Sequence, residues 1–375
     1  MKLGIISNVK GYAWAGSELV WYLSAMKALG EGHQVKAFLH PDIAASQQIA
    51  DFQELGGKVR TWTALPIARF QNIKERFLPT FPQSELDSLD VILVSLGSLP
   101  SLCYVPGLID GLMQTSTPIV LLIQFNADHL YISPVERELV AGVIRKSHSC
   151  VFVSERILNE ARRQFAVAPP NAAVISNPIR EQLAMPLAWP KDDSLVRFAC
   201  VARFEIAWKG QDLLLDVLSR PPWRERNWHL TFYGNGPDKK HLQQLVSFFR
   251  LEDRVTFAGH VESLREIWAD QQLLLLPSHG EGGPLAALEA MMFGRPVVIT
   301  DVGLARELVG DGQNGFLAEA STAFSFNSAL ERAWECRTHW EQIGNAAHHT
   351  AKKQVEKDPV TKLLDICLAA VAKSH

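Results

Sequence analysis

The chain has 375 residues, which is too long for one ordinary hydrophobic core and enough for two domains. Hydrophobic residues make up 47% and charged residues 21%, as in folded globular proteins. Lys and Arg number 37 against 40 Asp and Glu. The net charge of -3 gives no overall attraction to nucleic acid, so we expect no nucleic-acid partner.

Five cysteines are widely spaced and form no CxxC motif: Cys103, Cys150, Cys200, Cys336 and Cys367. We therefore expect a reducing compartment, without a disulfide framework or a zinc site. Residues 1–6 enter a strand directly, without the layout of a signal peptide. No apolar run reaches the ~20 residues that span a bilayer. These features predict a cytoplasmic protein, with peripheral contact at the inner membrane face as an additional expectation.

The first part of the chain alternates strands and helices. Residues 3–7 and 34–39 have the pattern of buried strands, and residues 17–29 between them have that of a helix. Two strands joined through a helix predict a parallel sheet. Further strands are expected over residues 58–62, 91–95, 119–124, 149–153 and 173–176, with helices over 135–146 and 155–165. Residues 1–180 are thus predicted to form one α/β domain.

Prolines and charges over residues 181–194 predict a linker. A second series of strands follows at 196–201, 230–233, 255–258, 273–276, 296–300 and 315–317. Helices are expected between them, around 211–218, 239–249, 263–269, 285–293 and 323–336. This predicts a second domain over 195–355 and a final amphipathic helix within 356–375. The fold class is α/β, with two doubly wound Rossmann-like domains facing across a cleft and ligands beyond the carboxyl ends of the strands.

The segment 278–290 carries the strongest functional signal. A predicted strand runs into Gly282 and Gly283, which let the backbone approach an anion closely. Pro284 suits the first helical position, and the N–H groups of the first turn, including Leu285 and Ala286, attract phosphate. Two carboxylates, Glu281 and Glu289, can accept hydrogen bonds from hydroxyl groups. An ordinary strand–turn–helix unit with two solvated glutamates explains this window equally well.

Three further strand ends carry polar groups. Arg203 and Lys209 follow the strand at 196–201, where two cations can neutralise a diphosphate. Each alone is equally typical of a protein surface. Gly234 opens a GNGP turn that lacks the third glycine of the dinucleotide motif, which counts against a Rossmann oxidoreductase. Gly259 and His260 end another strand, where the backbone can contact a flat base or form a plain turn.

The first domain offers weaker signals. Gly16 and Ser17 open a helix at the tip of the first strand, a second position suited to an anion. Trp14 and Tyr131 are candidates for stacking on a sugar or lipid acceptor, with core packing as the alternative. Residues 69–76 mix basic and apolar side chains, which is typical of a solvated segment and also suits an anionic lipid or acceptor.

In order and spacing, these motifs resemble the family 4 glycosyltransferases, retaining nucleotide-sugar enzymes of GT-B architecture. The resemblance is carried by Gly16, by Arg203 with Lys209, by the turn at 234–237 and by the Glu-x7-Glu pair. Segments 29–35, 294–298 and 311–317 also match. The likeness covers nearly the whole chain and is stronger in its second half.

The resemblance implies roles for individual residues. Arg203 and Lys209 would bind the leaving diphosphate together with the backbone of 283–286. Glu281 would bind hydroxyls of the donor sugar, and Glu289 those of the ribose. Gly16 would close on the diphosphate from the first domain, and the final helix would return to pack on that domain.

One departure concerns the first domain. The position at which the family often has a histidine, after the strand at 119–123, falls on Gln124. Gln124 and Asn126 can hydrogen-bond a sugar hydroxyl but cannot act as a base. His129 lies just beyond and is a candidate for the role, with a structural histidine as the alternative.

The function implied is transfer of a sugar from a UDP- or GDP-sugar to a hydroxyl of a glycan, glycolipid or small molecule, as in polysaccharide biosynthesis. In the family's front-face mechanism the departing phosphate takes the acceptor's proton. No Asp-x-Asp motif stands at a strand end, so we expect neither a metal nor a cofactor. The alternatives are a nucleotide-sugar-binding protein without activity, and another GT-B enzyme such as an epimerase or an inverting transferase.

Overall fold

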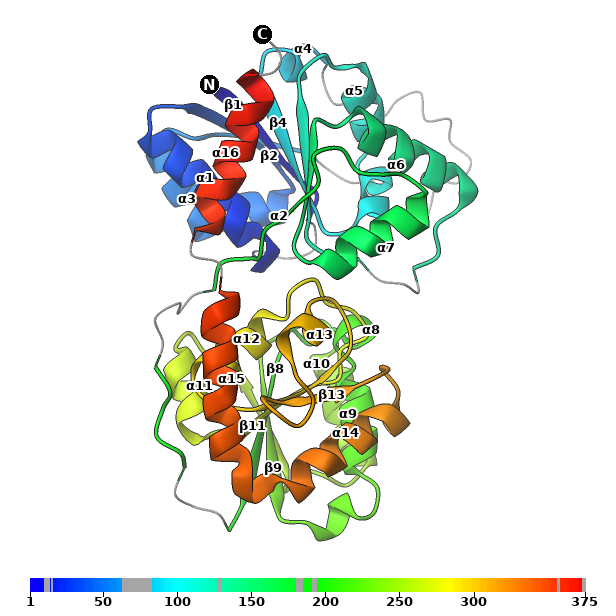
Figure 1. Ribbon diagram of the computed structural model, residues 1–375, viewed down its shortest axis with the longest axis vertical. Helices are drawn as coiled ribbons and strands as arrows, with labels where there is room; N and C mark the ends of the chain where they lie inside the picture. Colours follow the sequence, from blue (N-terminus) through cyan, green and yellow to red (C-terminus); the bar gives the residue numbers. More distant parts are fainter. Residues whose placement is uncertain are drawn as a thin grey trace. The chain divides into compact units, whose positions relative to one another are not determined.

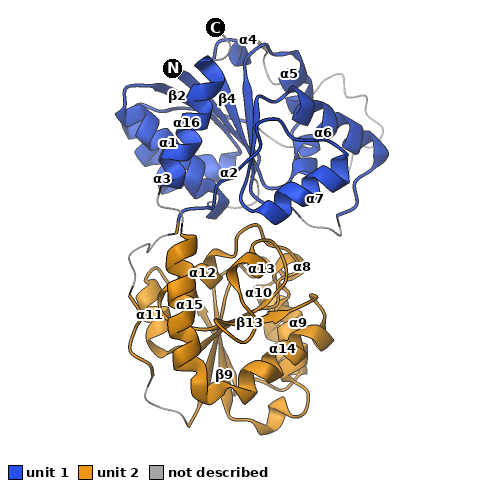
Figure 2. Cartoon of the chain, viewed as in Figure 1, with its two compact units in different colours: residues 1–178, 356–375 blue, residues 179–355 orange. Residues whose placement is uncertain are grey.

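The structure is a computed structural model that describes residues 1–9, 14, 16–62, 83–126, 130–179, 185–190, 194–355 and 358–372. Its chain divides into two compact units (Figure 2). Unit 1 comprises residues 1–178 and 356–375, and unit 2 comprises residues 179–355. The segment 69–76 lies outside the described residues.

Unit 1 is built on a seven-stranded sheet in the order β3-β2-β1-β4-β5-β6-β7, with every neighbouring pair parallel. The strands are β1 (Lys2–Ser7), β2 (Gln34–Leu39), β3 (Lys58–Thr61), β4 (Val91–Leu96), β5 (Ile119–Ile123), β6 (Ser149–Phe152) and β7 (Ala173–Val174). All residues of β4 and β5 are buried, as expected of central strands in a sheet that helices cover on both faces.

The helical segments of unit 1 are η1 (Gly16–Glu18), α1 (Leu19–Gly30), α2 (Pro41–Ala44), α3 (Gln47–Glu54), α4 (Gln83–Leu86), η3 (Leu99–Tyr104), α5 (Leu108–Gln114), α6 (Pro134–Lys146), α7 (Glu155–Phe165) and α16 (Pro359–Ala372). The last of these lies beside α1 (Figure 1), and Ser24 Oγ of α1 donates to Val360 O at 3.1 Å. The buried stripe of α16, which includes Leu363 and Cys367, joins the same core as β1 and β2.

Unit 2 has a six-stranded parallel sheet in the order β10-β9-β8-β11-β12-β13. Its strands are β8 (Val196–Val201), β9 (Trp228–Tyr233), β10 (Val255–Gly259), β11 (Leu273–Leu276), β12 (Val297–Thr300) and β13 (Phe316–Ala318). Its helical segments are α8 (Ile206–Lys209), α9 (Gln211–Leu218), η4 (Trp223–Glu225), α10 (Lys239–Phe248), α11 (Leu264–Asp270), α12 (Leu285–Met292), α13 (Ala305–Leu308), α14 (Ala323–Glu335), η5 (Arg337–His339) and α15 (Trp340–Gln354).

The predicted fold class of two doubly wound α/β domains is confirmed, because each predicted strand overlaps one strand of the structure. One detail differs. The first helix begins at Leu19, not Ser17, because residues 16–18 form a 3₁₀ turn. Two residues within the predicted linker contact unit 2: Leu187 N donates to Phe293 O at 3.1 Å, and Arg295 donates to the carbonyls of residues 187 and 188.

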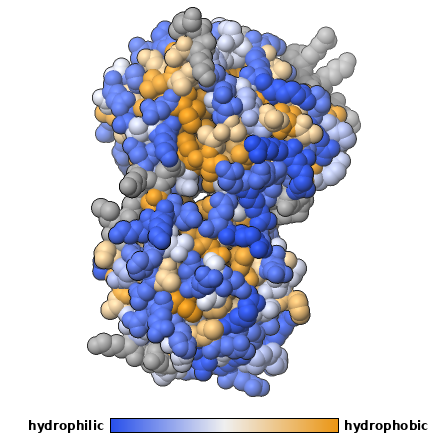
Figure 3. Space-filling view, viewed as in Figure 1, coloured by the Kyte–Doolittle hydropathy of each residue, from blue (hydrophilic) through white to orange (hydrophobic). Residues whose placement is uncertain are grey.

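Within the described residues, no helix is both long and apolar enough to cross a membrane. Figure 3 shows apolar residues in the middle of the visible face of each unit, with hydrophilic residues on either side. The visible face therefore carries short apolar patches between polar regions.

Candidate functional site

The strand order of unit 2 reverses between β8 and β11, which are neighbours in the sheet although two strands separate them in the sequence. Such a switch point leaves an open crevice beyond the carboxyl ends of its two strands. Arg203 and Lys209 follow β8, and Glu281 follows β11. The topology thus brings together three predicted site residues that the sequence holds up to 78 positions apart (281 minus 203).

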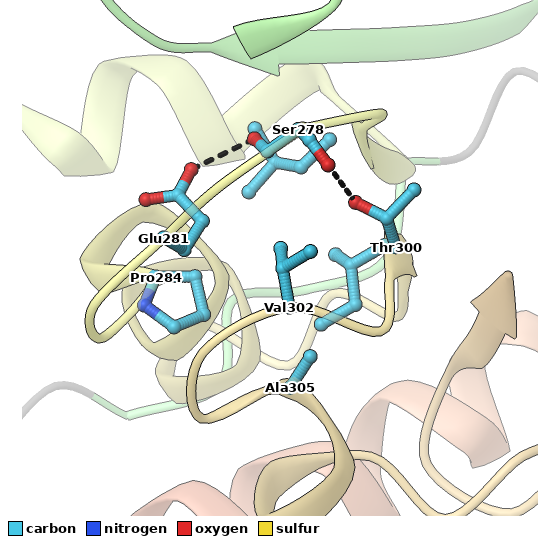
Figure 4. A pocket seen from close by; sticks show the side chains of 8 residues that line it. Ser278, Glu281, Pro284, Thr300, Val302 and Ala305 are labelled. Atoms are coloured by element: carbon cyan, nitrogen blue, oxygen red, sulfur yellow. Dashed lines mark hydrogen bonds between the residues drawn. The ribbon is translucent and has the colours of Figure 1, made fainter. Parts of the chain in front are cut away.

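Lys209 and Glu281 form an ion pair at this switch point, with Nζ 2.7 Å from Oε1. Ser278 Oγ donates to the same carboxylate oxygen at 2.7 Å (Figure 4). Ser278 is fully buried, whereas the Glu281 side chain is 12% exposed. Two donors therefore hold Oε1 of the carboxylate in place. The side chain stays partly exposed at the edge of the crevice.

Backbone contacts explain why Lys209 reaches Glu281. The carbonyl of Trp208 accepts the N–H of His279 at 2.9 Å, which joins α8 to the β11–α12 loop (residues 277–284). Gly210, at φ +61°, follows α8, and a Cβ there would lie 2.3 Å from Pro277 O. Only glycine combines that left-handed backbone with so close an approach.

Arg203 is paired with a carboxylate that sequence reasoning missed. Its Nε and Nη2 lie 2.9 and 2.6 Å from Glu205 Oε2. Both cations at the switch point therefore face a carboxylate. The signal that could have found Glu205 is its place two residues after Arg203, at the strand end.

The GNGP turn supports the Arg203 loop from the side of β9. Phe204 N donates to Asn235 O at 3.0 Å, and a Cβ on Gly234 would lie 2.2 Å from Ala202 O. Gly234, predicted to bind the donor, is thus also a packing position where two strand-end loops meet. It donates its N–H to Gly259 O at 2.7 Å, beside the exposed His260.

Helix α12 begins at Leu285, where the sequence predicts its start, but Pro284 precedes the helix instead of filling its first position. The N–H of Leu285, predicted to face an anion, donates to Gly283 O at 2.8 Å. Gly282 and Gly283 lead into this turn, followed by Ala286 in the first turn of α12 and by the half-buried Glu289 one turn later.

A small pocket opens beside Glu281, between the β11–α12 loop and the end of β12 (Figure 4). The side chains of Pro284, Val302 and Ala305 face it together with Glu281. Thr300 Oγ1, at the end of β12, donates to the carbonyl of Ser278. The pocket therefore has an apolar wall and one polar edge that carries the Glu281 carboxylate.

In unit 1, Gln124 directly follows β5 and is buried. Its Oε1 accepts Asn177 Nδ2 at 2.7 Å, whereas its Nε2 and Asn177 Oδ1 are buried without a hydrogen-bond partner within the described chain. Turning both amides would exchange the paired atoms and leave one spare donor and one spare acceptor again. Asn177 was not predicted; its position at the end of the predicted strand 173–176 was the available signal.

The other unit 1 candidates occupy different surroundings. Asn126 is buried and donates to Gln164 Oε1 of α7 at 2.9 Å. Tyr131 is 86% exposed. Trp14 packs edge-on against Tyr22, with ring centroids 5.4 Å apart. His129 lies outside the described residues.

Glu18 is a buried acid at the tip of β1 that the sequence analysis did not single out. Its Oε2 accepts Ser7 Oγ at 2.7 Å and Trp21 Nε1 at 2.9 Å. Burial raises its pKa from 4.5 to about 7, because the charged form loses its hydration. Gly16 and Ser17 precede it in the η1 turn, so the start of α1 already carries a carboxyl group.

The described residues contain no group of three or more His, Cys, Asp or Glu side chains placed to hold a metal ion. Cys200, in β8, has its pKa raised to about 12 by burial. Its thiol is therefore neutral at physiological pH and is a core residue.

Comparisons with known proteins agree with the architecture. Residues 196–335 match the family described as "Glycosyl transferases group 1". The N-acetyl-alpha-D-glucosaminyl L-malate synthase of Bacillus anthracis is 39% identical over 132 residues, which is 35% of this chain and 34% of that protein. The matched part of the chain spans only 21% to 34% of the length of this protein and two other curated relatives.

Two solved structures match over nearly their whole length. HepE of Anabaena in complex with UDP covers 99% of this chain and 100% of its own, with a TM-score of 0.74 at 19% identity. The lipopolysaccharide outer core galactosyltransferase WaaB, in its apo form, covers 100% of both chains with a TM-score of 0.69 at 17% identity. These likenesses identify the fold as GT-B.

Proposed function

We propose that the protein is a retaining glycosyltransferase that uses a nucleotide-diphosphate sugar and binds it at the switch point of unit 2. The observation that carries the proposal is the ion pair of Lys209 and Glu281 at the joined ends of β8 and β11. It lies within the residues that match the group 1 glycosyltransferases. The UDP complex of HepE, a protein of the same fold, supports a nucleotide ligand.

In this proposal the two cations stabilise the departing diphosphate, because charge-assisted hydrogen bonds are strongest where negative charge develops. Glu281 Oε2, the oxygen that does not bind Ser278 or Lys209, accepts a hydrogen bond from a hydroxyl of the donor sugar. Glu289 accepts hydrogen bonds from the ribose hydroxyls. The backbone at Gly283 and Ala286 completes the anion site.

The reaction would proceed on one face of the sugar. The acceptor oxygen bonds to the anomeric carbon on the side from which the diphosphate leaves, and the bond from that carbon to the phosphate oxygen breaks. The acceptor proton passes to the departing phosphate oxygen. No side-chain nucleophile or metal takes part in this scheme, and Arg203 and Lys209 supply the positive charge.

The first test is a thermal-shift and calorimetric screen of UDP, GDP, UDP-glucose and GDP-mannose. A ligand that binds only the folded state raises the melting temperature by mass action. Lys209→Met should weaken binding of the active nucleotide at least 10-fold and lower kcat/KM about 100-fold, the usual scale for one electrostatic contact to a transition state. Lys240→Met, which removes an exposed charge from α10, is the matched control.

Proton NMR of the product then decides the stereochemistry. Retention of the donor's anomeric configuration supports the proposal, and inversion would assign the chain to an inverting GT-B enzyme. If none of the four ligands raises the melting temperature and none binds in the calorimeter, the switch-point site is not a site for these donors.

A second candidate is a nucleotide-sugar-binding protein without transferase activity. It is favoured by Gln124, which occupies the family's histidine position and is tied to Asn177 inside unit 1. Incubation with the donor that binds separates the two. Release of the nucleotide diphosphate, lost in Arg203→Ala, argues for the enzyme. Tight binding without release, even at high protein concentration, argues for the binding protein.

A further inference from the structure

The last residue of β12, Thr300, and the β12–α13 loop, residues 301–304, contact the β11–α12 loop on both sides of Glu281. Thr300 Oγ1 donates to Ser278 O, three residues before the glutamate (Figure 4). Leu304 N donates to Gly282 O, directly after it, at 3.1 Å. Glu281 therefore stands between two hydrogen bonds whose donors lie at the end of β12 and in the loop that follows it.

Gly303 lies at the closest approach of these two loops. Its backbone has φ +54°, in the left-handed region. A Cβ at this position would lie 2.4 Å from Glu281 O and 2.4 Å from Gly282 O. Those atoms are backbone, so a side chain at residue 303 can be accommodated only if the two loops move apart.

A displacement of the β11–α12 loop would also displace the Glu281 carboxylate. Movement of the Glu281 backbone changes the distance between its Oε1 and Lys209 Nζ, now 2.7 Å, and the distance to Ser278 Oγ. Displacements of about 1 Å at a reacting centre can cost about 100-fold in rate. A side chain at residue 303 would therefore act on the site through the backbone of residues 281 and 282.

We propose that Gly303 and Thr300 are positioning residues that set the place of Glu281 for the donor sugar. The proposal rests on the transferase function proposed above for the same site. It adds a second strand to the site: β12 fixes the loop from one side, while α8 fixes it from the other through the Trp208 carbonyl. It predicts that variants at Thr300 and Gly303 alter catalysis through Glu281.

The chain supplies a matched control for the glycine. Gly312, in the turn between α13 and β13, also has a left-handed backbone with φ +74°, and a Cβ there meets no atom within 4 Å. Gly303→Ala and Gly312→Ala therefore share the backbone cost of an alanine in this conformation, but only the first creates a steric clash. The difference between the two variants in any measured property therefore reports the steric contact with the β11–α12 loop.

The first measurement needs no ligand. Hydrogen–deuterium exchange of a peptide covering residues 278–285 should be at least 10-fold faster in Gly303→Ala than in wild type, and unchanged in Gly312→Ala. Equal exchange in the two variants would overturn the positioning role. This result does not depend on whether the protein is a transferase.

The second measurement uses UDP-glucose and GDP-mannose, whichever binds the wild type. Gly303→Ala should lower kcat about 30-fold and raise KM less than 5-fold, since the carboxylate is misplaced but the nucleotide contacts on α12 persist. In a Glu281→Gln background the same change should lower kcat less than 3-fold further, because residues acting through one group are not additive. Full additivity would overturn the proposal.

Thr300 provides an independent variant should Gly303→Ala fold poorly. Thr300→Val removes the hydroxyl donor with little change of shape and should lower kcat about 5-fold, and Thr300→Ser should restore it. Failure of serine to rescue would refute a role for the hydrogen bond to Ser278. If the wild type binds neither nucleotide sugar while the exchange result holds, the proposed function fails and the loop contact stands.

Discussion

The buried carboxyl of Glu18 makes a pH-dependent contribution to stability that can be worked out from the structure. Its side chain is fully buried at the start of α1, and desolvation raises its pKa from 4.5 to about 7. The folded state therefore binds this proton more tightly than the unfolded state. Its stabilising contribution is fully present below pH 4.5 and is lost as the pH rises through 7.

The size of the effect follows from the shift. One pKa unit corresponds to ~1.4 kcal/mol, so a shift from 4.5 to about 7 removes about 3 kcal/mol of stability between mildly acidic and mildly alkaline pH. Glu18→Gln keeps the shape and an oxygen that can accept from Ser7 and Trp21. The glutamine side chain cannot ionise, so the variant should not lose this stability as the pH rises.

The assay is urea denaturation followed by circular dichroism at pH 5 and pH 8 and constant ionic strength. Glu18→Gln should be within ~1 kcal/mol of wild type at pH 5 and about 2 to 3 kcal/mol more stable at pH 8. Glu54→Gln, an exposed change on α3, is the control for net charge. Parallel pH profiles for wild type and Glu18→Gln would refute the reasoning.

Three further changes test the structural roles of other residues. Arg295→Met removes the donors to three carbonyls, of which that of Trp268 is buried, and should lower the free energy of unfolding by about 2 kcal/mol in urea titrations. Trp14→Ala should cost about 1 to 3 kcal/mol if the ring is a packing residue, and a loss of acceptor affinity at unchanged stability would instead support acceptor stacking. Gln124→Met leaves the Asn177 amide unpaired and should cost about 1 to 3 kcal/mol; unchanged stability with lost turnover would point to a direct role in the reaction.

The strands were predictable because buried parallel strands read as short continuous apolar runs, such as residues 91–94 and 273–276. Helix α15 was not predicted, although its buried face includes Trp340, Ile343, Ala347 and Ala351 at helical spacing. Two of these four are alanines, which give little hydrophobic contrast. The start of α1 was predicted two residues early because a 3₁₀ turn and an α-helix share their first signals.

The sequence predicted those site residues that belong to a recognisable local motif. Arg203, Lys209 and Glu281 lie in the segments that follow β8 and β11, and the parallel topology then brings these two strands together. Glu205 and Thr300 were missed because their importance depends on side-chain direction and on contacts between loops distant in sequence. The spacing of residues in the sequence does not show which loops contact each other in the folded chain.

The ion pairs of the switch point also affect how a donor must bind. Arg203 and Lys209 each face a carboxylate, so their two positive charges are balanced by Glu205 and Glu281. A diphosphate can gain from these cations only by sharing them with, or displacing, the carboxylates. Glu281 is itself proposed to bind the sugar, so Lys209 can contact phosphate and carboxylate together through its three N–H donors. Glu205 has no such part in the proposed reaction, which makes the Arg203–Glu205 pair the contact that donor binding has to reorganise.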